Sequence, residues 1–254
     1  MTMYLDGMCH HTLGSNWYIR RTVSSRVSKS QFHVGARKII VSSSSKGRER
    51  VCLPHLWVLR HGYSLANDAG LIVSHPSNGV LLDYGLAPEG FNQARRAGKQ
   101  LKDELQAEGL DPKLLRVICS PFSRTVQTAD TVRQVLGTQD SADVAFELRE
   151  RFFGTELELG PHTRYDEVWA RDALDVNHPA GGDGESVQEV ARRVAELLRR
   201  LEDQDKGQGV LLVAHGDVLQ ITQAYIAGGR GLEHLGAHRK FGMDTGELRR
   251  VLSR

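Results

Sequence analysis

Leu56-Trp57-Val58-Leu59-Arg60-His61-Gly62 is the stretch that decides the fold, because an apolar run ends in an arginine and a histidine. Four consecutive apolar residues are typical of a strand buried on both faces. In open α/β sheets, ligands bind beyond the carboxyl ends of such strands. An arginine there can hold a phosphate with its planar fork of donors, and a neighbouring imidazole can attack the phosphorus. The stretch therefore predicts a strand that carries Arg60 and His61 to a phosphate site.

Short apolar runs alternate with helical spacings of apolar residues from Val51 onward. The expected strands are Val51–Leu59, Leu114–Cys119 and Val210–Ala214. The expected helices are Leu86–Leu105, Pro121–Leu136 and Ser186–Leu201, the last beginning with the capping box Ser186-Val187-Gln188-Glu189. This alternation predicts an α/β fold, a three-layer sandwich with a mainly parallel central sheet and helices on both faces.

The first 50 residues differ in composition from the rest of the 254-residue chain. They hold nine lysines and arginines against two acids, together with nine serines, whereas the remainder holds 24 against 29. A basic, serine-rich and acid-poor leader is typical of an organellar transit peptide, and a disordered tail without a targeting role is the alternative. We expect residues 1–50 to be a disordered leader and residues 51–254 to form the folded domain. The expected destination is the chloroplast or mitochondrion, with the cytoplasm as the alternative.

Composition also argues against several kinds of partner. The folded part is mildly acidic, so no basic stripe for the phosphates of nucleic acid is expected. No apolar stretch approaches the roughly 18 residues that span a bilayer, so no membrane segment is expected. The cysteines Cys9, Cys52 and Cys119 are far apart and form no metal-binding pattern. Oligomeric state leaves no signature in a single sequence.

Polar residues follow each of the three expected strands at its carboxyl end. The first strand leads to Arg60-His61-Gly62, the second to Ser120-Pro121-Phe122-Ser123-Arg124, and the third to His215-Gly216-Asp217. If the strands are parallel neighbours, two arginines and two histidines face one point, which suits a dianionic phosphoryl group. Taken singly, each has an ordinary alternative: Ser120 as a helix cap before Pro121, Arg124 as a surface residue, and His215 as a core histidine.

Five motifs in this order resemble the histidine phosphatase superfamily, in its phosphoglycerate mutase-like branch. They are Leu59-Arg60-His61-Gly62, the stretch from Ser120 to Ala129, Leu148-Arg149-Glu150-Arg151-Phe152-Phe153-Gly154, Gly184-Glu185-Ser186 and Ala214-His215-Gly216. The final stretch, His238-Arg239-Lys240-Phe241 with Thr245-Gly246-Glu247-Leu248-Arg249, is most similar to plant and algal phosphoglycerate mutase-like proteins. The resemblance covers the chain from about Val51 onward and implies a phosphoglycerate mutase-like fold.

The resemblance also implies a role for each matching residue. His61 is expected to take the phosphoryl group on its ring nitrogen, and Glu150 to protonate the leaving oxygen and then to activate water. Arg60, Arg124 and His215 are expected to hold the phosphate oxygens, with His215 counted among the catalytic residues. Further contacts to the substrate are expected from Gly216, Ser64 and Asn67, although Ser64 and Asn67 are equally suited to capping a helix. No metal and no cofactor are required.

The identity of the proton donor stays open on sequence grounds, because Glu147, Glu156 and Glu158 lie close to Glu150. Glu150 is favoured because Leu-x-Glu-Arg-x-x-Gly matches the family at this position. Glu156 departs from the family pattern, since Glu156-Leu157-Glu158-Leu159-Gly160 replaces an expected Glu-Gly pair.

The expected function is metal-independent hydrolysis of a small phosphorylated metabolite through a phosphohistidine. The alternatives are a cofactor-dependent mutase and a non-catalytic protein that binds a phosphorylated ligand. Mutases of the family carry Ile-Trp-Arg-Arg in the segment that covers the site. Here that segment, about residues 155–182, reads Val168-Trp169-Ala170-Arg171, which favours the phosphatase. A cysteine phosphatase is excluded because only four residues separate Cys119 from Arg124, and no Gly-x-Ser-x-Gly elbow indicates a serine hydrolase.

Overall fold

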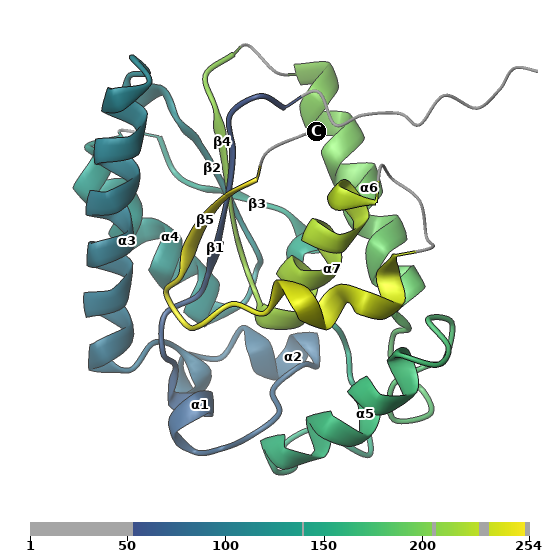
Figure 1. Cartoon of the computed structure of the whole chain (residues 1–254). Helices are drawn as coiled ribbons and strands as arrows, with labels where there is room; N and C mark the ends of the chain where they lie inside the picture. Colours follow the sequence, from purple (N-terminus) through teal and green to yellow (C-terminus); the bar gives the residue numbers. More distant parts are fainter. Residues whose placement is uncertain (1–52, 139, 205–206, 229–233, 252–254) are drawn as a thin grey trace, which may run out of the picture. The chain divides into compact units, whose positions relative to one another are not determined.

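The computed structural model describes residues 53–138, 140–204, 207–228 and 234–251, which all belong to one compact unit, Ser45–Arg254 (Figure 1). The expected leader, residues 1–50, and the first two residues of the first expected strand lie outside these ranges. Within the described ranges, no helix is both long enough and apolar enough to cross a membrane.

A five-stranded sheet forms the centre of the fold. Its strands are β1 (Leu56–Arg60), β2 (Arg116–Cys119), β3 (Asp143–Val144), β4 (Val210–Ala214) and β5 (Leu248–Val251), in the order β3-β2-β4-β1-β5. The first four are parallel, and β5 runs antiparallel to β1 at the edge. The register places Arg60 opposite Ala214 and Cys119 opposite Val213. The residues that follow β1, β2 and β4 therefore begin side by side.

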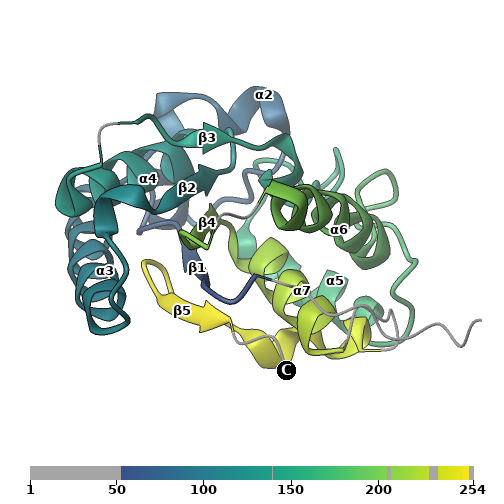
Figure 2. The same ribbon diagram turned by 90° about the horizontal axis from the view of Figure 1, so that it is seen from above.

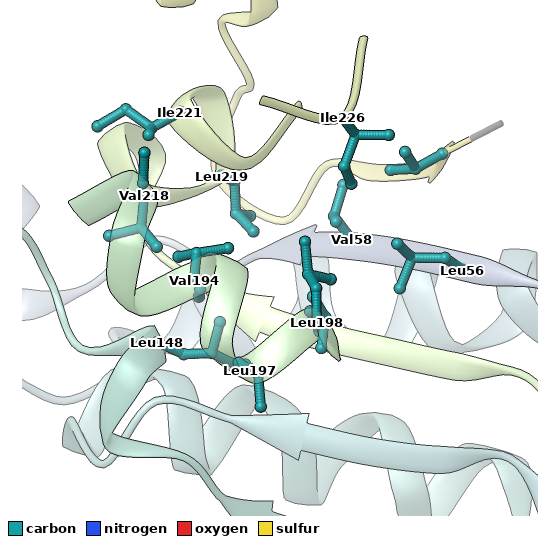
Figure 3. Packing of buried hydrophobic residues seen from close by; sticks show 14 of the residues in the cluster. Leu56, Val58, Leu148, Val194, Leu197, Leu198, Val218, Leu219, Ile221 and Ile226 are labelled. Carbon is teal, nitrogen blue, oxygen red and sulfur yellow. The ribbon is translucent and has the colours of Figure 1, made fainter. Parts of the chain in front are cut away.

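Two pairs of helices cover the two faces of the sheet (Figure 2). Trp57 and Leu59 of β1 pack against α3 (Pro88–Ala107) and α4 (Ser123–Leu136). Leu56 and Val58 point to the other face, where they pack against α6 (Val187–Gln204) and α7 (Gly216–Ala227), as Figure 3 shows. Both faces of β1 are buried in this way, which is why its sequence is an unbroken apolar run. The predicted three-layer α/β sandwich with a mainly parallel sheet is confirmed.

Each of the six expected segments is present, with shifted ends. Pro54 precedes the regular part of β1, and β2 begins at Arg116 after a 3₁₀-helix, η2 (Pro112–Leu114). The helix expected from Pro121 begins at Ser123, because Ser120 and Pro121 form a turn in which the Ser120 hydroxyl accepts the Phe122 amide, 3.3 Å away. The capping box of α6 forms as expected, with Ser186 and Glu189 exchanging hydrogen bonds.

Short helices gather where the parallel strands end, beyond the carboxyl end of β1 (Figure 1). They are α1 (Leu65–Asp68), α2 (Pro76–Gly79) and α5 (Tyr165–Asp172). Glu158 ties two of the segments together, since it accepts hydrogen bonds from the Ser74 amide and hydroxyl and from the Asn78 side chain. Glu158, in the stretch 156–160 that departs from the family pattern, therefore fixes the segment from Ser74 to Asn78.

Candidate active site

His61 lies immediately beyond β1 and is 3% exposed. Its Nδ1 is 2.8 Å from the carbonyl oxygen of Gly62, which can only accept, so Nδ1 carries the proton. Its Nε2 faces the Nε–H of Arg124 at 3.2 Å, which can only donate, so Nε2 carries the lone pair. Burial, reinforced by Arg124 and Arg60, holds the pKa of His61 well below its ordinary value. The ring is neutral near pH 7, with a nucleophilic nitrogen facing the site.

The two arginines expected to hold phosphate both act on His61, Arg124 through the hydrogen bond to Nε2 and Arg60 through its charge. Arg60 is fixed by a 2.6 Å hydrogen bond from Nη1 to the Met243 carbonyl, and Arg124 by a 3.0 Å bond from Nη2 to the Val73 carbonyl. Two further donors, Arg60 Nε and Arg124 Nη1, are buried and have no partner among the described residues. Buried donors are rarely left unpaired, so this pair points to an anionic ligand.

His215 directly follows β4 as the N-cap of α7 and lies edge-on to His61, with ring centroids 5.3 Å apart. Its Nε2 is 2.8 Å from the Ser120 hydroxyl, which accepts the Phe122 amide and so is free to donate to the imidazole. That arrangement favours a proton on Nδ1, a buried nitrogen without a partner among the described residues. His215 is fully buried behind the cavity wall, so the structure brings it to the site as a neighbour of His61.

Glu150 is the glutamate that the structure brings to the site. Its Oε2 lies 3.9 Å from Arg124 Nη2 and 3.7 Å from His215 Nδ1, and the residue is 7% exposed. Burial raises the pKa of Glu150 to about 7, against the opposing effect of Arg124 and with a smaller contribution from Asp217. A carboxyl group with that pKa can give a proton and take it back near neutral pH.

The other glutamates considered from the sequence are engaged elsewhere. Glu147 pairs with Arg200 at 2.8 Å and Glu156 with Arg164 at 2.9 Å, while Glu158 holds the segment around Ser74. None of the three lines the cavity that contains His61. The structure therefore separates Glu150 from its neighbours by position and by burial.

Ser64 and Asn67 line the cavity, but their hydrogen bonds are those of a helix cap. Ser64 is the N-cap of α1, and its hydroxyl donates to Asn67 Oδ1 at 2.8 Å while accepting the Asn67 amide at 3.2 Å. Gly216 opens α7 against the guanidinium of Arg60, where an added Cβ would lie 3.3 Å from Arg60 Cζ. A hydrogen at this position lets the start of the helix approach the phosphate site closely.

A second buried charge cluster adjoins Glu150. Arg151 donates to both oxygens of Asp172, at 2.6 and 2.8 Å, and to Asp217 at 3.0 Å. Asp172, Asp217 and His238 could by spacing hold a metal ion, but the guanidinium of Arg151 already supplies the positive charge between the two carboxylates. Asp217 also accepts the indole N–H of Trp169 at 3.0 Å, which ties α5 to the start of α7.

The site opens into a cavity of about 890 Å³. Of the cations in the cover segment 155–182, His162 lines it, whereas Arg164, Arg171 and His178 do not. Arg239 of the 3₁₀-helix η5 (Leu235–Phe241) also lines the cavity. The sequence did not indicate this position, because Arg239 lies 178 residues after His61 and stood out only as part of the motif His238-Arg239-Lys240-Phe241. Cys119 is buried, and burial raises the pKa of its thiol to about 12, which agrees with the exclusion of cysteine chemistry.

A sequence model of the histidine phosphatase superfamily (branch 1) matches residues 56–252, and the chain belongs to this superfamily. The adenosylcobalamin/alpha-ribazole phosphatase of Salmonella typhimurium is 32% identical over 173 residues, which cover 66% of this chain and 77% of that protein. Phosphoglycerate mutase-like protein 4 of Arabidopsis thaliana is 27% identical over 68% of this chain and 70% of that protein.

The fold is similar to solved structures of phosphatases as well. The alpha-ribazole phosphatase structure from Shigella flexneri superposes with a TM-score of 0.58 at 25% identity, covering 79% of this chain and 96% of that one. These matches confirm the predicted superfamily, the fold and the enzyme class of a phosphatase for small phosphorylated compounds.

Proposed function

We propose that this chain hydrolyses a small phosphomonoester in two steps, with His61 as nucleophile and Glu150 as the group that carries the proton. The observation that supports this most directly is that an unprotonated His61 Nε2 and a carboxyl group whose pKa is about 7 line the same cavity, each beside Arg124. Arg60 Nε and Arg124 Nη1 are donors available for the phosphate oxygens, and His215 lies buried behind them with its Nδ1 3.7 Å from Glu150 Oε2. The positive charge that stabilises the transferring phosphoryl group is thus supplied by arginine side chains.

In the first step, His61 Nε2 attacks the phosphorus and the bond from phosphorus to the alcohol oxygen breaks. Protonated Glu150 gives its proton to that oxygen, and the alcohol leaves. The products are an N-phosphohistidine on Nε2 and an ionised Glu150. The carbonyl of Gly62 stabilises this state, because it accepts the Nδ1 proton of a ring that now carries positive charge.

In the second step, ionised Glu150 takes a proton from a water molecule whose oxygen attacks the phosphorus. The phosphorus–nitrogen bond breaks, and inorganic phosphate leaves. His61 returns to its neutral form with the lone pair on Nε2, and Glu150 is protonated again. One carboxyl group serves as acid and then as base, which is efficient because its pKa is close to the working pH.

Hydrolysis is favoured over a mutase reaction by the charges around the cavity mouth. A mutase must hold a second phosphate or a phosphorylated acid while water is kept out. Apart from Arg60 and Arg124, the cavity lining includes one arginine, Arg239, and the carboxylates Asp166 and Asp244. That balance of charge does not compensate a second dianion.

The test is phosphate release by the full chain over a panel of phosphomonoesters, with EDTA present and with His61→Ala as control. We expect turnover that falls by at least about a thousandfold in the variant, because the nucleophile is lost. Acid-quenched samples should contain an acid-labile phosphate on the parent protein and none on the variant. Interconversion of phosphoglycerates without release would establish a mutase, and tight phosphate binding without turnover would establish a binding protein.

We propose that residues 1–50 target the protein to the chloroplast or mitochondrion. The proposal is supported by their nine basic residues, two acids and nine serines. A fluorescent protein fused after residue 50 should enter an organelle and lose mass on import. A fusion that stays in the cytoplasm at full length would contradict the proposal.

A further inference from the structure

Arg239 lies in the 3₁₀-helix η5 and lines the cavity that contains His61 and Glu150. Its guanidinium lies over the Trp169 ring, with Cζ 3.4 Å from the ring centroid. Its Nη1 donates to Gln220 Oε1 at 2.9 Å. Trp169 and Gln220 line the same cavity as His61 and Glu150. Arg239 is therefore held by two contacts while it lines the cavity.

The platform under Arg239 is itself rigid. Trp169 stacks on Tyr165 with the two rings 16° from parallel and 5.1 Å apart. Its indole nitrogen donates to Asp217, which the buried Arg151 holds in turn. A cation held in one place loses less conformational entropy when it binds an anion than a mobile surface arginine does.

Arg239 also lacks an acidic partner within 4.0 Å among the described residues. Arg151 and Arg164, by contrast, each pair with a carboxylate. An exposed arginine without a partner is usually only solvated, but this one is stacked, bonded to an amide and directed into a phosphate-handling cavity. Those features together are typical of an anion-binding subsite.

The nature of the anion follows from the surrounding charges. Asp166 and Asp244 line the same cavity and would repel a second phosphate dianion. A single guanidinium edge matches the two oxygens of one carboxylate. We propose that Arg239, positioned by Trp169 and Gln220, binds a carboxylate on the alcohol part of the substrate. The substrate class is then the phosphomonoesters of small hydroxy acids, an inference that rests on the proposed phosphatase function.

The test compares two esters that differ in one group, 3-phosphoglycerate and glycerol 3-phosphate. Each is used as a competitor of p-nitrophenyl phosphate hydrolysis, and the ratio of their two inhibition constants is the readout. We expect the parent to bind the carboxylate ester about ten- to a hundredfold more tightly, as a charged hydrogen-bonded pair provides. Arg239→Met should bring the ratio close to one, and Arg239→Lys should give an intermediate ratio, because lysine keeps the charge without the planar fork.

Arg164→Met is the matched control, because Arg164 lies in the cover segment, pairs with Glu156 and does not line the cavity. It should leave the ratio unchanged. Absence of p-nitrophenyl phosphate turnover in the parent would remove the proposed phosphatase function and this inference with it. Turnover with a ratio near one in the parent would overturn the inference alone. So would an equal weakening of both esters by Arg239→Met, which would give Arg239 a purely structural role.

Discussion

Arg124 and Arg151 are two buried arginines on either side of Glu150, and their surroundings differ sharply. Arg124 is 4% exposed, has a donor without a partner and stands 3.9 Å from a carboxyl group whose pKa is about 7. Arg151 is 0% exposed and saturated by Asp172 and Asp217. Burial lowers the pKa of Arg124, whereas at Arg151 the two aspartates outweigh burial and raise the pKa. Arg124, the arginine of the unpaired site, has a donor available to a ligand. Arg151, the arginine of the paired site, has its donors occupied by Asp172 and Asp217 and stabilises the fold.

The same substitution at both arginines tests this difference. Arg151→Met should lower the free energy of unfolding by about 3 to 5 kcal/mol, because two buried carboxylates lose their partner. Denaturant unfolding followed by circular dichroism gives the value. Arg200→Met, which removes an exposed pair with Glu147, is the control and should cost at most about 1 kcal/mol. Equal losses for the two variants would show that burial of the pair contributes nothing.

Arg124→Met should produce the opposite pattern. We expect kcat/KM to fall by about a hundred- to a thousandfold, because one preorganised donor to the phosphoryl oxygens is lost. The free energy of unfolding should stay within about 1 kcal/mol of the parent, since no buried acid loses a full ion-pair partner. Steady-state kinetics and denaturant unfolding on the same preparation provide both numbers. A stability loss as large as that of Arg151→Met would erase the distinction between the two sites.

The unpaired site was largely predictable from the sequence, and the paired one was not. Arg60 ends β1, His61 and His215 directly follow β1 and β4, and Arg124 lies in the first turn of the helix after β2, so the parallel register brings them together. The Arg151 cluster joins residues from three separate segments whose pairing depends on how α5 and α7 pack. No local pattern marks Asp172 or Asp217 as partners of Arg151. Arg239 escaped prediction for the same reason.

The fold shows the same division. The buried strands β1, β2 and β4 are apolar runs and were predicted nearly to the residue at their carboxyl ends. The edge strand β5 carries only Leu248 and Val251 as apolar residues, because its other side chains face solvent or an edge, and such a strand has no distinctive pattern. Ser64 and Asn67 matched both a cap and a substrate contact in sequence, and their hydrogen bonds show the cap.

Ionisation of the buried Glu150 lowers the free energy of unfolding at alkaline pH. Its pKa is about 7 in the folded protein against an ordinary value of 4.5, so between these values the folded state holds a proton that the unfolded state has released. The free energy of unfolding therefore falls as pH rises through this window, and the full penalty is present above pH 7. Glu150→Gln should raise the free energy of unfolding by roughly 2 to 3 kcal/mol at pH 8.

The pH dependence of that gain distinguishes it from a general repacking effect. At pH 4.5 the gain should be close to zero, because Glu150 is then protonated in the folded state and glutamine resembles a protonated carboxyl group. Urea unfolding of both proteins at pH 4.5, 6 and 8 measures it. A gain of equal size at all three values would mean that ionisation of Glu150 is not the cause.

Asp217 links the two clusters, because it pairs with Arg151 and also acts on the pKa of Glu150. Its substitution is expected to change activity least among the variants considered. Its carboxylate raises the pKa of Glu150, whose carboxyl group also faces Arg124, His215 and Arg60, while Arg193 donates to the backbone carbonyl of Glu150. Asp217→Asn keeps an acceptor for Trp169 but removes the charge, so the pKa of Glu150 should fall and less of the proton donor should remain at high pH. We expect kcat/KM at pH 8, relative to pH 6, to drop about two- to fivefold.

Asp172→Asn is the matched control, because Asp172 is the other carboxylate on Arg151 and, unlike Asp217, is not among the main causes of the raised pKa of Glu150. It should lower stability while the shape of the pH–rate profile stays that of the parent. Identical profiles for Asp217→Asn and the parent would show that the two clusters are electrically independent. A shifted profile in Asp217→Asn alone would mean that a structural ion cluster also tunes the proton donor, because its net charge is felt across a buried and weakly screened distance.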